Sequence, residues 1–249
     1  MSKVIAALDN SAAARPVLAT AAALARLLDA ELEAVHVIED GGTTARAVAE
    51  AAGVALRTLE GPELERLVAA CQEAEVSAVV AGTRGTPAGR RPAGHVALAL
   101  IRALSKPVVV VPPQASTPPR LGRILVPLDG TRQTAAALRS TIELARGPDT
   151  EVVVLHVLGA PSLPLFSDQP QHEAEVWTRE FLARFCPCPD DVRLEVRVGL
   201  AEEAVLRVAV EIGADLIALG WSRDLSPGRA KVVRDALHRS DVPILLVPV

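Results

Sequence analysis

Short apolar runs alternate with helix-length segments along the whole chain of 249 residues. In the first half the apolar runs are Val4–Leu8, Leu32–Ile38, Ala55–Leu59, Ala78–Ala81 and Val108–Val111. Helical patterns fill the intervals at Val17–Leu28, Thr44–Ala52, Glu63–Glu73 and Val96–Leu104. Strands that are apolar on both faces and separated by helices are typical of a parallel sheet covered on both sides. We therefore predict an α/β fold.

The second half repeats this order of elements. Its strands are predicted at Ile124–Leu128, Val152–Val157, Leu194–Val198, Leu216–Leu219 and Ile244–Val247. Asp9 and His36 return as Asp129 and His156, both at an offset of 120 residues (129 − 9 and 156 − 36). Gly82 returns as Gly220 at an offset of 138, so the second copy carries an insertion of 18 residues (138 − 120). Such self-similarity predicts two tandem domains of one kind.

The insertion and the domain junction are both rich in proline. The insertion falls around Pro161–Pro170, before a helix expected near Glu173–Phe185. The segment Pro112–Pro119 is polar and proline-stiffened, so neither sheet is expected to continue through it. We place the first domain at residues 1–112 and the second at residues 123–249.

The last strand of each half is short, apolar and bracketed by prolines, at Pro107–Pro112 and Pro243–Pro248. An exposed edge strand of this kind would promote aggregation. Pairing of the two strands would cover both and give an intramolecular pseudo-dimer. The alternative is that each run is an interior strand of its own sheet. Association of whole chains into a further homo-oligomer stays open.

Composition excludes several classes of function. The net charge is −4 and only 2% of the residues are aromatic, so neither attraction to phosphate backbones nor base stacking is expected. The sequence has neither a signal pattern nor an apolar run long enough to span a membrane. Cys186 and Cys188 are expected to be surface thiols, Cys71 a core residue, and no metal site is predicted. We expect a cytoplasmic protein without nucleic-acid or membrane partners.

The loop after the fourth strand carries the candidate chemistry. It contains Gly82, Gly85 and Gly94, with Arg84 between the first two and His95 at the start of a helix. Glycines allow the backbone to approach a ligand, and a helix start offers N–H groups to an anion. A plain surface turn uses the same residue types. The common catalytic signatures are absent, so nothing in the sequence requires an enzyme.

These residues and the repeat resemble the universal stress protein family in its tandem form. The resemblance implies two five-stranded parallel α/β domains and an adenine nucleotide (ATP, ADP or AMP) as cofactor, with Mg²⁺ accompanying it. It places the adenine contacts on Asp9 and Val37. It places the phosphate loop on Gly82, Arg84, Gly85, Gly94 and His95. Only eight residues separate Gly85 from Gly94, against nine in the family motif, and His95 replaces a Ser or Thr.

The second copy departs further from the motif. Arg223 replaces the second glycine, Ala230 and Lys231 replace the closing pair, and Trp221 directly follows Gly220. The resemblance therefore implies a nucleotide sensor or regulator that binds its ligand in the first domain only. One alternative is a nucleotide-free interaction or scaffold protein in which both loops have degenerated. Another is an enzyme acting on an adenylate or phosphate ester in the same cleft.

Overall fold

A computed structural model describes residues 2–38, 43–83, 94–116, 118–145, 149–159, 170–186, 192–226 and 229–249. The first half forms, in chain order, β1 (Lys3–Ala7), α1 (Ala14–Leu27), β2 (Glu31–Val37), α2 (Thr44–Ala51), β3 (Leu56–Leu59), α3 (Glu63–Gln72), β4 (Val76–Gly82), α4 (His95–Ala103) and β5 (Val108–Val111). Helix α1 begins three residues before its predicted start because Pro16 fits the first turn, where no N–H is needed.

The second half repeats this order, as the sequence predicts. It forms β6 (Arg123–Pro127), α5 (Arg132–Leu144), β7 (Glu151–Leu158), α6 (Pro170–Phe185), β8 (Val192–Val198), α7 (Ala201–Glu211), β9 (Leu216–Trp221), α8 (Lys231–Arg239) and β10 (Ile244–Pro248). Helix α6 has 16 residues, whereas its counterpart α2 has eight. Of the segment around Pro161–Pro170, where the insertion was predicted, only Pro170 lies within the described residues.

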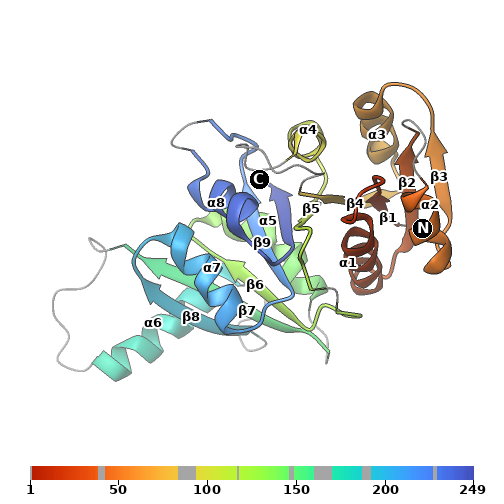
Figure 1. The fold of residues 1–249 in the computed structure, drawn as a ribbon. Helices are drawn as coiled ribbons and strands as arrows, with labels where there is room; N and C mark the ends of the chain where they lie inside the picture. Colours follow the sequence, from red (N-terminus) through yellow and green to blue (C-terminus); the bar gives the residue numbers. More distant parts are fainter. Residues whose placement is uncertain are drawn as a thin grey trace.

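All the strands join in one ten-stranded sheet, in the order β3-β2-β1-β4-β5-β10-β9-β6-β7-β8. Within each half the strands run parallel. At the centre β5 pairs antiparallel with β10, with Val109 opposite Leu245. These are the two proline-bracketed strands that the sequence analysis expected to cover each other. Figure 1 shows the two halves lying side by side, with β5 between them.

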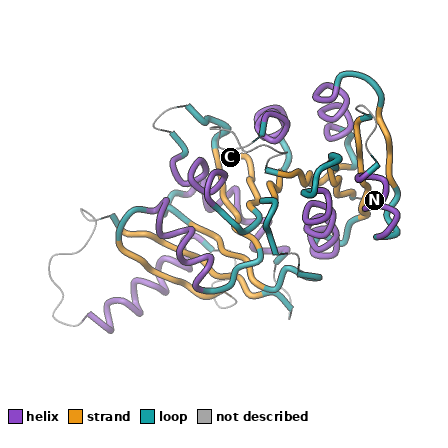
Figure 2. The backbone as a smooth tube through the Cα atoms, viewed as in Figure 1, coloured by secondary structure: helices purple, strands orange, loops and turns teal. Residues whose placement is uncertain are grey.

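Helices cover both faces of this sheet (Figure 2). One buried cluster unites the sheet with α1, α2, α5 and α6, and a second unites it with α3, α4, α7 and α8. Each cluster contains residues of both halves, so the core is continuous through the β5–β10 junction. This explains why β5 is buried at all four of its positions.

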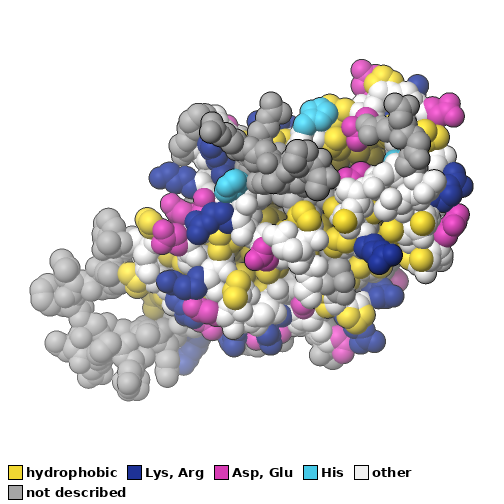
Figure 3. Space-filling view, viewed as in Figure 1, with side chains coloured by type: hydrophobic (Ala, Val, Ile, Leu, Met, Phe, Trp, Pro, Cys, Tyr) yellow, Lys and Arg dark blue, Asp and Glu magenta, His cyan; other side chains and the backbone are white. Residues whose placement is uncertain are grey.

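The outer strands and the surface are polar. On edge strand β8, Arg193, Glu195 and Arg197 alternate with apolar residues, and Arg197 pairs with Glu195 at 2.6 Å. Charges on an edge strand oppose pairing with another chain. On the face shown in Figure 3, basic and acidic side chains are interspersed rather than gathered by sign. Among the described residues, no helix is both long and apolar enough to cross a bilayer.

Candidate functional site

Each half has a cleft at the same place in its fold. In open parallel sheets ligands bind beyond the carboxyl ends of the strands, where the strand order reverses. That point lies between β1 and β4 in the first half and between β6 and β9 in the second. Because β5 runs antiparallel to β10, the two clefts open at opposite edges of the sheet. One ligand therefore contacts one cleft only.

The first-domain cleft, of about 230 Å³, brings together five of the residues named from the sequence. Asp9 follows β1, Val37 ends β2, Gly82 ends β4, and Gly94 and His95 begin α4. All five line the cleft. The other two predicted residues, at positions 84 and 85, lie outside the described residues, so the structure does not place them.

Asp9 shapes the turn that leads into α1. Its Oδ1 accepts hydrogen bonds from the Ser11 backbone N–H at 3.1 Å and from the Ser11 hydroxyl at 2.7 Å. The Ser11 Oγ in turn accepts the Ala13 N–H. Asp9 itself is exposed, and its Oδ2 makes no hydrogen bond within the described residues. One carboxylate oxygen therefore holds the turn while the other is available to a ligand donor.

His36 and Asn10 form a hydrogen-bonded wall of the same cleft. His36 Nδ1 lies 2.8 Å from the Leu8 carbonyl, so it carries the proton and donates. Nε2 then accepts from the Asn10 amide at 3.3 Å, and Asn10 Oδ1 accepts the N–H of Ala45 in α2. His36 thus has a structural role, because both of its ring nitrogens bond within the domain. Asn10 was not predicted from the sequence; its only signal is its position directly after Asp9.

Gly82 and Gly94 have different positions in the cleft wall. A Cβ on Gly82 would lie 3.5 Å from Ala13 and 3.6 Å from Val17, at ordinary contact distance, so the space beside α1 admits an alanine but nothing larger without a shift. Gly94 is the N-cap residue of α4, and its N–H donates to the Thr83 carbonyl. That bond joins the two described ends of the loop. The Thr83 hydroxyl is buried and makes no hydrogen bond within the described residues.

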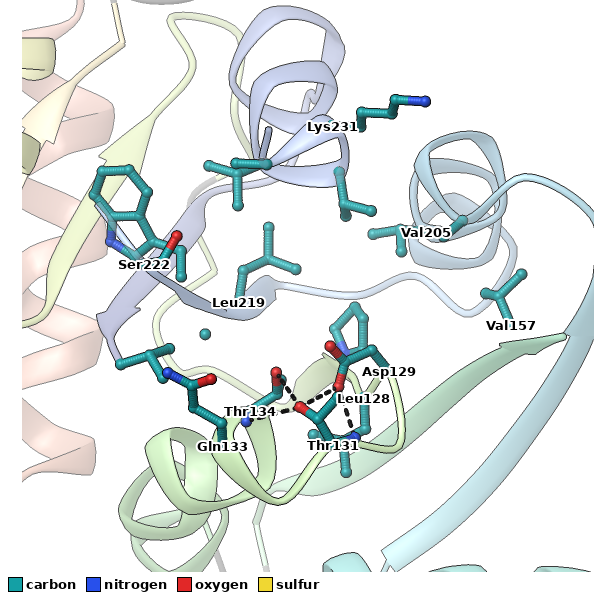
Figure 4. Close-up of a pocket in the computed structure, with 18 of the residues that line it drawn as sticks. Leu128, Asp129, Thr131, Gln133, Thr134, Val157, Val205, Leu219, Ser222 and Lys231 are labelled. Carbon is teal, nitrogen blue, oxygen red and sulfur yellow. Dashed lines mark hydrogen bonds between the residues drawn. The ribbon is translucent and has the colours of Figure 1, made fainter. Parts of the chain in front are cut away.

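The second-domain cavity is larger, about 450 Å³ (Figure 4). Asp129 repeats the turn of Asp9, because its Oδ1 accepts from the Thr131 N–H at 2.9 Å and from the Thr131 hydroxyl at 2.8 Å. The Thr131 Oγ1 then caps α5 by accepting the Thr134 N–H. Gly130 stands in this turn at φ 80°, a left-handed conformation that glycine adopts without steric cost.

The loop after β9 differs from the sequence expectation. Trp221 was expected in the loop but ends the strand, because β9 pairs with β10 as far as Pro248. Its side chain is 3% exposed and belongs to the buried cluster of α8. Arg223 and Ala230, which replace motif glycines, have φ values of 60° and 44°. The backbone therefore adopts the left-handed conformation at two non-glycine positions of this loop, which is uncommon outside glycine.

Hydrogen bonds hold the residues that follow Trp221. The Asp224 carboxylate accepts the Ser226 N–H at 2.9 Å, and hydrogen bonds from Ser226 lower the pKa of this exposed carboxyl. Arg234 of α8 donates to the Leu225 and Ser226 carbonyls at 3.5 and 3.3 Å. Arg234 thus fastens this loop to α8.

An aromatic stack distinguishes the second half from the first. His156 Nδ1 lies 2.8 Å from the Leu128 carbonyl, repeating the bond of His36. Gly130 stands where the first half has Asn10, and the His156 ring packs on Phe181 at 4.6 Å and Trp177 at 5.5 Å. Packing against helix α6 therefore fixes the His156 ring, whereas a hydrogen bond with Asn10 fixes the His36 ring.

Two cysteine expectations are tested. Cys71 is fully buried, as predicted, and burial raises the pKa of its thiol to about 12. The prediction of a surface thiol at Cys186 is wrong. Cys186 directly follows α6, its N–H donates to Leu182, and it is only 6% exposed. Position 188 lies outside the described residues.

These features define a parallel α/β protein in which each half has a cleft at the carboxyl ends of its strands. The sequence profile of the universal stress protein family matches residues 121–248. Universal stress protein G of Shigella flexneri is 31% identical over 116 residues, which cover 40% of this chain and 78% of that protein. The chain belongs to the universal stress protein family.

Solved structures share the fold over the whole chain. A protein of unknown function from Pseudomonas aeruginosa PAO1 superimposes with a TM-score of 0.70 at 14% identity, covering 100% of this chain and 92% of that one. A universal stress protein from Archaeoglobus fulgidus DSM 4304 gives 0.62 at 16% identity, covering 99% and 96%. At these identities the likeness concerns the fold alone.

Proposed function

We propose that this protein binds an adenine nucleotide in the first-domain cleft and acts as a cytoplasmic sensor or regulator, with residues 1–112 and 123–249 as its two domains. The observation that carries the proposal is the convergence of Asp9, Val37, Gly82, Gly94 and His95 on one cleft. These residues come from three separate strand ends and one helix start.

The chemistry of the cleft supports this choice of ligand. The second carboxylate oxygen of Asp9 accepts hydrogen bonds, as the exocyclic amine of adenine requires. Helix α4 has nine residues and begins at the cleft, where its first N–H groups and its dipole favour an anion. Glu63 also lines the cleft and adds negative charge. Mg²⁺ carried by the phosphates would offset this charge.

The repeat provides a matched pair of variants. His95 and Lys231 are the first residues of the equivalent helices α4 and α8, and both are exposed. His95→Glu places a negative charge where phosphate is proposed to bind, and Lys231→Glu does the same in the second cleft. Acidic residues in a first turn are favourable to the helix, as Glu63 and Glu65 show in α3, so both variants should fold.

The measurement is binding of Mg-ATP, ADP and AMP by titration calorimetry, together with thermal unfolding. At a nucleotide concentration ten times the Kd, the native state should gain about 1.4 kcal/mol. His95→Glu is expected to raise the Kd about tenfold, which corresponds to about 1.4 kcal/mol of lost affinity. Lys231→Glu is expected to leave that Kd within twofold of its original value.

Three other outcomes would indicate a different binding site or a different function. If only Lys231→Glu weakens binding, the nucleotide occupies the second domain and the proposal fails. If millimolar nucleotide shifts nothing in the folded protein, the chain is a nucleotide-free interaction or scaffold protein. Time-dependent ATP consumption that disappears in Asp9→Ala would instead identify an enzyme.

A further inference from the structure

Helix α2 takes its N-terminal cap from a distant part of the chain. Thr43 occupies the N-cap position of α2, but its side chain makes no capping hydrogen bond. The Ala45 N–H instead donates to Oδ1 of Asn10, at 3.1 Å, from a residue 35 positions earlier in the sequence. An N-cap side chain normally accepts from the second or third residue of a helix, and Ala45 is the second residue of α2. Asn10 therefore acts as the cap of α2 from the turn after β1.

This cap is important because few other contacts hold α2. The helix has eight residues, and its buried side chains are those of Ala45, Val48 and Ala49. Its counterpart α6 has 16 residues and buries Phe181 and Leu182. Two alanines and one valine bury little apolar area, and a helix as short as α2 is marginal without its contacts. Figure 1 shows α2 at the outer end of the first half, away from the β5–β10 junction.

The hydrogen bonds behind this cap can run in one direction only. At one end the Ala45 N–H can only donate, and at the other end the Leu8 carbonyl can only accept. Asn10 therefore turns Oδ1 to Ala45 and its amide N–H to Nε2 of His36, which lies 3.3 Å away. Nε2 of His36 must accept, and Nδ1 must carry the proton that is donated to Leu8 at 2.8 Å. Every bond in this series thus requires the neutral imidazole with its proton on Nδ1.

Protonation of His36 breaks this series of bonds. The imidazolium has two N–H donors and no acceptor, so its Nε2–H faces the N–H of the Asn10 amide. The amide can accept from His36 only by turning over, which presents its NH₂ group to the Ala45 N–H and removes the cap. Histidine is the side chain whose charge ordinarily changes between about pH 5 and 8. An acid shift within this range therefore acts on the cap of α2.

No charged partner fixes the protonation state of His36. Within the described part of the chain, His36 forms no ion pair. Strand β3 places the neutral Thr58 beside it in register. The charged side chains at the same end of the adjoining elements are all exposed, and they are Asp9, Arg15, Arg46 and Glu60. Solvent and salt screen such exposed charges, so the hydrogen bonds described above dominate the surroundings of the ring.

The second half lacks this arrangement at the equivalent position. Gly130 stands where the first half has Asn10, and it has no side chain to donate to His156. A Cβ on Gly130 would lie 3.5 Å from the His156 ring, so the two positions are also equivalent in space. The His156 ring packs on Phe181 and Trp177, and aromatic faces attract a cation. Protonation of His156 therefore breaks no capping bond.

We propose that Asn10 and His36 form a pH-sensitive clasp, which holds the start of α2 at neutral pH and releases it in acid. Both residues also line the first cleft. Release of α2 frees the Asn10 side chain in the cleft wall, so the clasp makes ligand binding in that cleft depend on pH. This last step rests on the proposed function, whereas the opening of α2 does not.

Hydrogen exchange tests the clasp in the whole folded protein. The quantity measured is the protection factor of the α2 amides at pH 7.5 and 5.0, which corrects for the intrinsic effect of pH on exchange, with α1 as internal reference. Loss of a helix cap shifts a helix-opening equilibrium by about fivefold. We expect α2 protection to fall by about this factor at pH 5.0 while α1 keeps its protection. Circular dichroism confirms folding at both pH values.

Variants distinguish the clasp from a contact that has a structural role only. Asn10→Gly should lower α2 protection at pH 7.5 to the level of the unchanged protein at pH 5.0. Asn10→Asp keeps the shape and offers an acceptor both to Ala45 and to a protonated His36, so protection should no longer fall in acid. His36→Gln has a donor and an acceptor but does not titrate, so pH should have no effect. His156→Gln is the matched control from the second half and should leave the fall unchanged.

Three results would overturn the proposal. The first is equal α2 protection at both pH values in the unchanged protein. The second is a loss of protection that α1 shares equally, because the release is local to α2. The third is an undiminished acid effect in Asn10→Asp or in His36→Gln.

The consequence for the first cleft is measured separately, by titration with ADP at both pH values. The Kd for ADP should rise more between pH 7.5 and 5.0 in the unchanged protein than in His36→Gln, a comparison that cancels the titration of ADP itself. Equal rises, with α2 opening as expected, would refute control of the cleft by the clasp. Absence of ADP binding at either pH would refute the proposed function, while hydrogen exchange still decides whether the clasp opens.

Discussion

The junction of β5 and β10 makes a strong prediction about folding, namely that the two halves unfold together. Leu245 is 5% exposed and lies opposite Val109, which is fully buried, at the centre of the ladder. Leu245→Ala removes a buried side chain from a core that spans both halves, at a cost of about 3 kcal/mol. For a chain of this size that loss lowers the Tm by roughly 6–12 °C.

The assay is differential scanning calorimetry, with Val35→Ala as the matched variant in the first half. Val35 is 1% exposed in β2, which is separated from β5 by the two strands β1 and β4. Both substitutions should lower the Tm of the same single transition, and the calorimetric and van't Hoff enthalpies should agree. Two resolved transitions, each moved by only one of the variants, would refute the reasoning.

Further predictions follow from individual contacts. The Cys71 thiol should resist labelling in the folded protein at pH 8 and react once urea unfolds the chain. Burial raises the pKa of this thiol from 9.0 to about 12, so the thiol ionises first in the unfolded state. The free energy of unfolding, measured by urea titration, should therefore fall as the pH rises between these two values. Asp215 Oδ2 accepts the N–H groups of Gly122 and Arg123 at 2.8 and 2.9 Å, so Asp215→Ala should cost about 2 kcal/mol in urea unfolding, and an unchanged midpoint would contradict this. At Gly82 an alanine side chain fits at ordinary contact distance, whereas a valine side chain crowds α1. Gly82→Val should therefore lower the free energy of unfolding by about 1–3 kcal/mol and Gly82→Ala by much less, measured by thermal melts.

Much of the fold could be predicted from the sequence because its signals are local. Continuous apolar runs such as Val108–Val111 indicate buried parallel strands, and the repeat identifies the second half as a copy of the first. The proline-bracketed runs pointed to the central β5–β10 ladder. Element ends were harder to predict, since Trp221 joins β9 only through the ladder with β10.

The clefts were less predictable because side-chain direction and burial depend on distant segments. The sequence identified Asp9, Val37, Gly94 and His95, which converge on one cleft. It missed Asn10, whose importance arises only when His36 and Ala45 approach it in space. The sequence also assigned Gly82 to this site, and Gly82 lines the cleft.

The two clefts share one sheet yet open at opposite edges, and this geometry constrains any communication between them. The first cleft is lined by the ends of β1, β2 and β4, and the second by the ends of β6, β7 and β9. The connection that joins these strand sets through the sheet is β4-β5-β10-β9. Close-packed cores of this kind are rigid rather than gradually deformable. Binding in one cleft should therefore stabilise the whole chain, because both halves share one core, without altering the shape of the other cleft.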